Sequence, residues 1–406
     1  MSTAAAVLER CARLGLLSEE PGRLVRRYAT PAMREANDLV AGWMREAGLA
    51  VREDAAGNLI GHRGDGKALV LGSHLDTVID AGRYDGPLGV LAGVALVERL
   101  RDAPLPFALE VVGFADEEGV RYPTSFLGSS AMAGRFAPAW LRLADADGVT
   151  MADALRAFGG DPDAVASAAR APGELVAYCE LHIEQGPVLE RRGAPVGVVT
   201  AISGQTHARV GFRGEAGHAG TVPMDARRDA LCAAAEWVLA AEALARDRPG
   251  LVATVGRLEV DPGARNVIPG EARLSLDVRH GSDAVRREAI ADLRGEAQRV
   301  AAARAVQLAW EAHGETAAVP TEPQLSERLA DAVAAAGRPV ERLPSGAGHD
   351  GVAMAAIAPI AMLFVRCAGG ISHHPAESVS EADVAVALDV LERFARALAC
   401  GAAERP

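Results

Sequence analysis

Residues 67–78, KALVLGSHLDTV, decide the fold. The first part of this segment is apolar without interruption from residue 68 to residue 71, which predicts a strand that is buried on both faces. The second part is polar and carries His74 and Asp76 directly after the strand. Because parallel α/β sheets bind ligands beyond the carboxyl ends of their strands, chemistry is expected at this loop.

A helix and a second strand follow this segment. Apolar residues recur at helical spacing over 89–101, and residues 107–114, FALEVVGF, are apolar except for Glu110 and predict a second strand that leads to Asp116, Glu117 and Glu118. Strand, helix and strand in this order predict a βαβ unit with parallel strands. We therefore expect both polar loops to open into one crevice.

Two further apolar strands lead to histidines. Residues 175–181 run into His182, and residues 359–365 precede His373 and His374. With the first two strands they indicate an α/β domain with a mixed, mainly parallel sheet.

The pattern between these two strands is different. It contains predicted strands over 208–212, 251–258 and 272–278 and predicted helices over 227–244 and 284–304. Strands and long helices in this alternation indicate a separate α/β sandwich. We predict that it is inserted at 206–316, between the two parts of a catalytic domain at 1–205 and 317–406.

Length and composition exclude several classes of protein. The chain has 406 residues, of which 50% are hydrophobic and 24% are charged, and this composition is globular. The net charge of −12 argues against nucleic acid as a partner, because a phosphate backbone requires clustered basic residues. The longest uncharged apolar stretch, 351–365, contains Pro359 and is too short to span a bilayer, and the amphipathic N-terminus lacks the apolar region of a signal peptide. We expect a cytoplasmic protein without membrane contact.

The polar residues near the strand ends are ligand types that divalent transition metals prefer. The five cysteines lie far apart with no CxxC pair, so any metal must be held by histidine and carboxylate. Imidazole and carboxylate together accept zinc, manganese, cobalt or nickel. The candidate ligands are His74, Asp85, Glu117, Glu118, His182 and His373. Two metal ions that share one carboxylate would use five such groups.

Two neighbours of these ligands suggest a division of roles. Asp76 lies two residues from His74, so we expect it to reach that imidazole and fix its tautomer. Glu117 and Glu118 are adjacent, and adjacent side chains on an extended segment point apart, so we expect one to bind metal and the other to transfer protons. A core histidine or a solvated acidic turn would explain His74 or the glutamate pair alone, but not all of these groups together.

Eight motifs follow one another between residues 72 and 377: GSHLDTV, DGPLGVLAGV, DEEG, ELHIEQG, AGHAGTVPM, RNVIPG, SGAGHD and GISHHPAE. Together they resemble the hydantoinase/carbamoylase branch of the zinc aminoacylase and carboxypeptidase superfamily. That branch includes allantoate amidohydrolase, N-carbamoyl-L-amino-acid hydrolase and β-ureidopropionase. The resemblance implies a zinc-exopeptidase-like catalytic domain and an inserted domain that acts in dimerisation and as a lid.

The resemblance also implies how the ligands are shared. One metal ion would be held by His74 and His182 and the other by Glu118 and His373, with Asp85 between the two. Glu117 would be the general base and acid. His374 lies beside His373, and the motif alone does not exclude an exchange of these two.

Substrate recognition is expected to fall on the inserted domain, with Gln185 and Gly348 as further candidates. The resemblance assigns His218 to oxyanion stabilisation across a homodimer interface, and Asn266 and Arg279 to the substrate carboxylate. Arg279 has the planar fork that suits a carboxylate but also suits a surface ion pair, and Asn266 is equally typical of a turn. Gln185 can offer an amide to a ureido group or be a simple loop residue, and Gly348 can let the backbone approach a substrate.

We therefore predict an amidohydrolase with two divalent metal ions that cleaves a non-peptide carbon–nitrogen bond in a carboxylate-bearing ureido acid. Allantoate is the first candidate substrate, and an N-carbamoyl-L-amino acid or 3-ureidopropionate is the alternative, because each carries a carboxylate and a ureido group. An N-acyl-amino-acid hydrolase or dipeptidase could use the same metal pair. A metal-binding relative without catalysis is the last alternative, and the presence of Glu117 argues against it.

Overall fold

The computed structural model describes residues 3–403, which form two compact units. Unit 2 consists of Ala201–Pro320 and Pro344–Gly346, and unit 1 of the other described residues. The insertion predicted at 206–316 falls inside unit 2. Each unit has its own buried apolar core.

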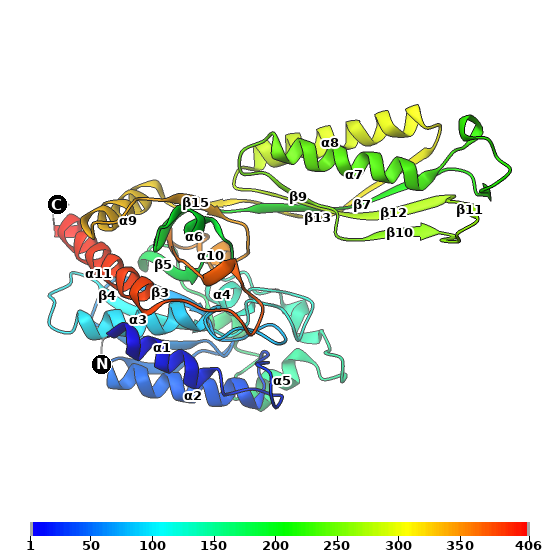
Figure 1. Ribbon diagram of the computed structural model, residues 1–406. Helices are drawn as coiled ribbons and strands as arrows, with labels where there is room; N and C mark the ends of the chain where they lie inside the picture. Colours follow the sequence, from blue (N-terminus) through cyan, green and yellow to red (C-terminus); the bar gives the residue numbers. More distant parts are fainter. Residues whose placement is uncertain (1–2, 404–406) are drawn as a thin grey trace. The chain divides into compact units, whose positions relative to one another are not determined.

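Unit 1 is built on a mixed sheet (Figure 1). Its strands are β1 (Ala50–Glu53), β2 (Leu59–Arg63), β3 (Ala68–His74), β4 (Ala108–Phe114), β5 (Leu175–Ile183), β6 (Val196–Ile202) and β16 (Ile360–Val365). They lie in the order β1-β2-β4-β3-β5-β16-β6, and the short β14 (Val319–Pro320) and β15 (Arg342–Ser345) pair with β6. Strands β4, β3, β5 and β16 run parallel to one another, whereas β1, β2 and β6 are antiparallel to their neighbours. The predicted α/β class with a mainly parallel central sheet is confirmed.

Helices surround this sheet. They are α1 (Thr3–Leu14), α2 (Pro31–Glu46), α3 (Pro87–Arg99), α4 (Leu127–Met132), α5 (Met151–Phe158), α6 (Val188–Arg192), α9 (Pro323–Ala335), α10 (Gly351–Met354) and α11 (Glu381–Ala403). Helix α3 packs against β3, β4 and β5, and α1 and α11 pack against α3. Among residues 3–403, no helix combines the length and the apolarity needed to cross a membrane.

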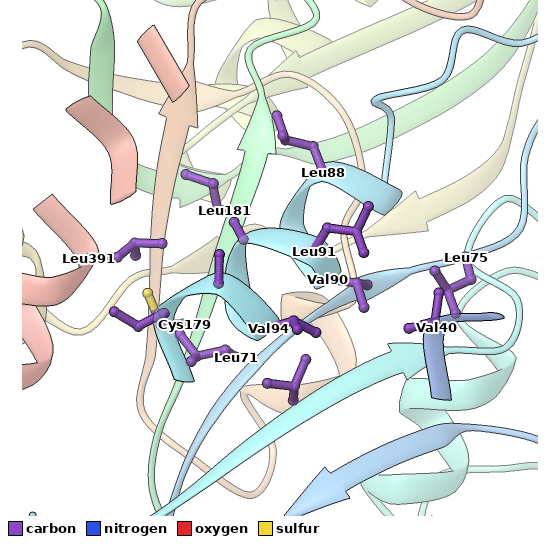
Figure 2. Close-up of a cluster of buried hydrophobic side chains, with 14 of the residues drawn as sticks. Val40, Leu71, Leu75, Leu88, Val90, Leu91, Val94, Cys179, Leu181 and Leu391 are labelled. Atoms are coloured by element: carbon purple, nitrogen blue, oxygen red, sulfur yellow. The ribbon is translucent and has the colours of Figure 1, made fainter. Parts of the chain in front are cut away.

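Helix α3 forms the centre of the unit 1 core. It is apolar on nearly every side, as is typical of a helix with neighbours all around it, and every residue from Pro87 to Val97 is buried. Figure 2 shows Leu88 and Leu91 of α3 among side chains from β3, β5 and α11. Pro87 is the first residue of the helix, a position where its missing N–H costs nothing. The helix therefore begins at a fixed point beside the end of β3.

Unit 2 is an antiparallel sheet with two helices on one face (Figure 1). The sheet has the order β10 (Leu258–Asp261), β12 (Glu271–His280), β7 (Gly204–Arg213) and β13 (Gln307–Thr316), and β9 (Val252–Thr254) also pairs with β12. The helices are α7 (Ala230–Arg246) and α8 (Asp283–Ala303), and β8 (Gly217–His218) pairs separately with β11 (Val267–Ile268). The side chains of β7 alternate between buried and more exposed, as expected for a sheet covered on one face. Trp237 of α7 fills the core beside Phe212, and its Nε1 donates to the carbonyl of Leu293 at 2.9 Å.

The expectation of one continuous strand over 251–258 is wrong. The structure contains β9 and β10 instead, separated at residues 255–257. Both pair with β12, and between them the backbone N–H of Ser275 bonds the carbonyl of Arg257 at 3.1 Å. Gly256 lies at the break, which fits the weakness of glycine within a strand.

Candidate metal centre

The candidate ligands of unit 1 meet at the carboxyl ends of its parallel strands. They are His74 at the end of β3, Asp85 in the loop before α3, Glu117 and Glu118 after β4, His182 near the end of β5, and His373 after β16. Groups of three among them have donor atoms within 4.8 Å of one another. The structure thus brings together residues that are almost 300 positions apart in the chain, because parallel strands end at the same edge of the sheet.

Asp85 lies at the centre of this cluster. Its Oδ1 atom is 3.0 Å from His182 Nε2 and 3.7 Å from His74 Nε2. Its Oδ2 atom is 3.2 Å from His373 Nε2, which in turn is 3.6 Å from Glu118 Oε1. The two oxygens of one carboxylate therefore face two different sets of donors.

Backbone carbonyls orient the two buried imidazoles. His74 Nδ1 is 3.1 Å from the carbonyl oxygen of Asp76, and His182 Nδ1 is 3.0 Å from that of Ile183. A carbonyl only accepts, so in the neutral rings Nδ1 carries the proton and Nε2 keeps its lone pair, which is directed toward Asp85. The Asp76 carboxylate, which the sequence suggested for this role at His74, lies slightly farther from the ring, with Oδ1 at 3.4 Å from Nδ1.

The Asp76 carboxylate has another function in the structure. It is buried, and its two oxygens accept the backbone N–H groups of Glu117 at 3.0 Å and Glu118 at 3.1 Å. The loop after β3 and the loop after β4 are thereby joined. Side-chain oxygens of both glutamates come within 4.8 Å of each other and of a His74 nitrogen. The expectation that the two side chains point apart is wrong, because this segment bends after β4 and is not extended.

The structure distinguishes the two adjacent histidines. His373, with a left-handed φ of 54°, directs its ring to Asp85 and Glu118. His374 is exposed, and its Nδ1 accepts the backbone N–H of Ala376 at 3.1 Å. Only His373 of the two therefore lies among the candidate ligands.

Gly86 makes room for His74. Its φ is +83°, and a Cβ atom built there would lie 2.5 Å from Cε1 and Nδ1 of His74. A side chain would therefore meet both an unfavourable backbone conformation and a direct clash with the ring. Glycine after Asp85 lets the loop pass close to the imidazole.

The carboxylates of the cluster differ in how readily they ionise. Burial raises the pKa of Glu117 well above its usual range, and the nearby Glu118 carboxylate adds to this effect. Burial also raises the pKa of Glu118 to about 7, with Asp85 and Asp76 adding to it. Burial opposes the charged form of Asp85 too, but the rings of His182, His373 and His74 outweigh it and hold the pKa of Asp85 well below its usual range. Negative charge is thus most stable on Asp85, and Glu117 is well suited to hold a proton.

Gln185 and Gly348 lie beside this cluster. Gln185 Nε2 donates to Asp85 Oδ2 at 2.8 Å and to Ser372 Oγ at 3.2 Å, and its buried Oε1 has no hydrogen-bond partner among the described residues. A Cβ atom at Gly348 would lie 2.8 Å from Phe126 Cζ and 3.7 Å from Glu117 Oε1. Gly348 therefore lets its loop pass close to the ring of Phe126, next to Glu117.

Arg279 lies near one end of β12 in unit 2. Asp277 accepts from its Nε at 3.1 Å and from its Nη2 at 2.8 Å, and the carbonyl of Gly346 accepts from Nη1 at 2.9 Å. These bonds fix the guanidinium and leave one N–H on each Nη that they do not use. The guanidinium lines a cavity of about 590 Å³ together with His207 and His313.

His218 and Asn266 lie together, but not with Arg279. His218 pairs with Val267 in the β8 and β11 ladder, the carbonyl of Asn266 accepts the N–H of Ala219 at 3.0 Å, and both His218 and Asn266 are exposed. At about 3.3 Å per residue, β12 spans roughly 26 Å from Glu271 to Arg279. In Figure 1 β11 lies at the end of the unit 2 sheet away from β9, with which Arg279 pairs. Unit 2 of one chain therefore does not present Asn266 and Arg279 to the same small carboxylate.

Comparison with known proteins identifies the family. The family described as Peptidase family M20/M25/M40 matches residues 70–397 of this chain. The chain belongs to this family.

Relatives place the chain more closely within the M20 family. It is 44% identical to an N-carbamoyl-L-amino acid amidohydrolase of Geobacillus stearothermophilus over 97% of this chain and 98% of that protein. It is 38% identical to an allantoate deiminase of Arabidopsis thaliana over 94% of this chain and 80% of that protein. A crystal structure of an amidase of the hydantoinase/carbamoylase family from Burkholderia multivorans superposes with a TM-score of 0.91 at 33% identity, covering 98% of both chains. The predicted hydantoinase/carbamoylase branch, and with it the assignment to a hydrolase, are confirmed.

The donors of this M20 chain fit divalent cations. His74, Asp85 and His182 form one group of donor atoms and Asp85, Glu118 and His373 another, so that Asp85 belongs to both. The Nε2 atom of His182 is buried and has no hydrogen-bond partner among residues 3–403, although Asp85 Oδ1 is only 3.0 Å away. A buried imidazole nitrogen with a free lone pair beside a carboxylate is suited to a cation. These residues therefore fit a metal centre by the chemistry of their donors.

Sequence reasoning missed two residues of this region. Glu377 is buried and accepts the backbone N–H groups of Tyr84 and Asp85, and Ser372 Oγ donates to Asp85 Oδ2 at 2.8 Å. Both lie in GISHHPAE, the motif that contains His373. The signal was present, since a carboxylate and a hydroxyl flank the candidate ligand within five residues.

Proposed function

We propose that this chain is a metal-dependent amidohydrolase that cleaves a carbon–nitrogen bond in a ureido acid. The observation that carries the proposal is the position of Asp85 between His74 and His182 on one side and His373 and Glu118 on the other. One carboxylate between two such donor sets suits a pair of divalent cations. Manganese and zinc are the first candidates, because imidazole and carboxylate accept both.

Each candidate site residue of unit 1 then has its own role in the reaction. Bound cations would supply Lewis acidity and make water a stronger nucleophile at neutral pH. Glu117 takes a proton from the attacking water and delivers it to the departing nitrogen. The free Oε1 of Gln185 accepts an N–H of the ureido group. Gly348 would let the backbone of its loop approach the substrate near Glu117.

Two substrates compete for this site. Allantoate, the first candidate from the sequence, would yield ureidoglycine or ureidoglycolate with ammonia and carbon dioxide, and the similarity to allantoate deiminases supports it. The higher identity to an N-carbamoyl-L-amino acid amidohydrolase, 44% against 38%, supports an N-carbamoyl-L-amino acid. Both carry a carboxylate that the fixed guanidinium of Arg279 is suited to bind.

The proposal includes a homodimer. His218 and Asn266 lie at one end of the unit 2 sheet and Arg279 at the other, which supports the prediction that two subunits contribute to each site. In this arrangement His218 and Asn266 of one chain serve the partner's substrate. His218 would stabilise the oxyanion that forms at the ureido carbon.

Turnover on three substrates tests the proposal. Ammonia release is measured with allantoate, N-carbamoyl-L-methionine and 3-ureidopropionate, each with manganese and after dialysis against a chelator. We expect turnover of at least one substrate with manganese, loss of that activity to below detection after chelation, and recovery when manganese is returned. Hydrolysis of N-acyl-amino acids or dipeptides in preference to all three ureido acids would overturn the substrate class. Activity that survives complete metal removal would overturn the mechanism.

A further inference from the structure

Glu377 holds the loop that carries Asp85. Its side chain is buried, and Oε1 accepts the backbone N–H of Tyr84 at 2.8 Å and that of Asp85 itself at 3.1 Å. These bonds join residues 292 and 293 positions apart in the chain. The Glu377 carboxylate therefore connects the segment that carries His373 to the loop that carries Asp85.

Ser372 holds the side chain of Asp85, whereas Glu377 holds its backbone. Its hydroxyl donates to Asp85 Oδ2 at 2.8 Å and also lies 3.3 Å from Glu377 Oε2. The backbone nitrogen of Asp85 is thus fixed by Glu377, and its carboxylate by a hydroxyl that contacts the same glutamate. A carboxylate held at both ends has little freedom to rotate about its own side-chain bonds.

The loop is shaped around Glu377. A Cβ atom at Gly82 would lie 2.3 Å from both Cδ and Oε1 of Glu377, which is impossible without movement of the loop or of the glutamate. Glycine at this position lets residues 82–85 close around the carboxylate. Glu377 is therefore buried within the loop formed by residues 82–85 and is not a surface acid.

We propose that Glu377 and Ser372 are positioning residues that set the distance between Asp85 and His373 and thereby the affinity of the centre for divalent cations. His373 directly follows Ser372 in the chain, and its Nε2 is 3.2 Å from Asp85 Oδ2. One short segment, 372–377, thus supplies a candidate ligand and also fixes the carboxylate that faces it. This inference rests on the metal centre of the proposed function, and it assigns Glu377 and Ser372 a role through Asp85.

Competition for manganese between the purified protein and a fluorescent chelator tests this proposal. The variants are Glu377→Ala, Glu377→Gln and Ser372→Ala. Residues that orient metal ligands typically change affinity by about 10- to 100-fold. We expect Glu377→Ala to weaken manganese binding by about that factor and Ser372→Ala by about 10-fold. Glu377→Gln keeps an oxygen for both N–H groups, so it should restore most of the affinity lost in the alanine variant.

Glu190→Ala is the matched control. Glu190 also accepts a backbone N–H near the same segment, that of Gly369 at 3.1 Å, but it is exposed and does not contact Asp85. We expect this control to bind manganese like the wild type. The melting temperature of each metal-free variant shows whether the fold is intact. A purely structural role would lower that temperature without changing the affinity of the folded protein.

Two outcomes overturn the inference. The first is a wild-type manganese affinity in the folded Glu377→Ala variant. If that variant does not fold, the second is a wild-type manganese affinity in Ser372→Ala, because this change removes only a hydroxyl. If these variants bind like the wild type while the wild type hydrolyses ureido acids with manganese, the positioning role falls and the proposed function stands. If the wild type itself binds no divalent cation, the proposed function fails and the inference fails with it.

Discussion

The two units hold their polar residues in opposite ways. In unit 1 the candidate ligands His74, Asp85 and His182 are almost completely buried, and carbonyls and carboxylates of other loops orient them. In unit 2 His218 and Asn266 are exposed, and Arg279 lies at the other end of the sheet. The difference teaches that the candidate ligands of unit 1 are gathered and held in place by their neighbours, whereas the candidate substrate residues of unit 2 are spread over the two ends of its sheet.

Glu117→Gln tests the unit 1 half of this comparison and should have the largest effect. Glutamine keeps the shape but cannot transfer the proton, so kcat should fall by about 10²- to 10⁴-fold. Manganese content, measured by elemental analysis, should stay at the wild-type level. Full activity in this variant would remove Glu117 from proton transfer, and loss of metal would make it a ligand, which its distance to His74 permits.

His218→Ala tests whether unit 2 acts on a partner. Removal of an oxyanion donor should lower kcat by about 10²- to 10³-fold without loss of metal. When this variant is mixed with Glu117→Gln and the subunits exchange, half of the dimers should be mixed and each should carry one intact site. About a quarter of wild-type activity should return if the dimer is symmetric and shares its sites. No recovery after verified exchange would mean that each chain works alone.

Arg279→Lys is the smallest of these changes. Lysine keeps the charge but loses the planar fork that Asp277 holds, so KM should rise about 10-fold, with a smaller change in kcat. Arg273→Lys is the control, because Arg273 lies on the same strand, is exposed and pairs with Glu271 at 2.9 Å. Steady-state kinetics on the preferred ureido acid compare the two. An equal KM in both variants would make Arg279 an ordinary ion-pair residue.

Much of unit 1 could be predicted because burial leaves a clear sequence pattern. The predicted strands over 68–71 and 107–114 are mostly apolar, and the polar residues that follow them revealed His74 and the pair of glutamates. Strand β13 escaped prediction because most of its residues are exposed and its sequence, QLAWEAHGET, has no apolar run. The break between β9 and β10 was missed because it depends on how both strands pair with β12.

Within the centre, the hardest contacts to predict were those in which a side-chain carboxylate accepts backbone N–H groups of another segment. The contact of the Asp76 carboxylate with the N–H groups of Glu117 and Glu118 depends on a bend that no side-chain pattern reveals. The same holds for Glu377, whose partners are N–H groups on a loop almost 300 residues away. Backbone N–H groups are present at nearly every residue, so the sequence carries no mark of which ones are used.

The amino-acid sequence by itself determined which strands are buried, which ligand types follow them and to which family the chain belongs, because apolar runs and residue chemistry are local properties. Only the tertiary structure decided that His373 and not His374 faces Asp85, that Glu117 and Glu118 both approach His74, and that Arg279 lies far from Asn266. These are distances between segments that are remote in the chain. They depend on how strands pair and how loops bend, and a few degrees of backbone rotation change them without changing a single residue.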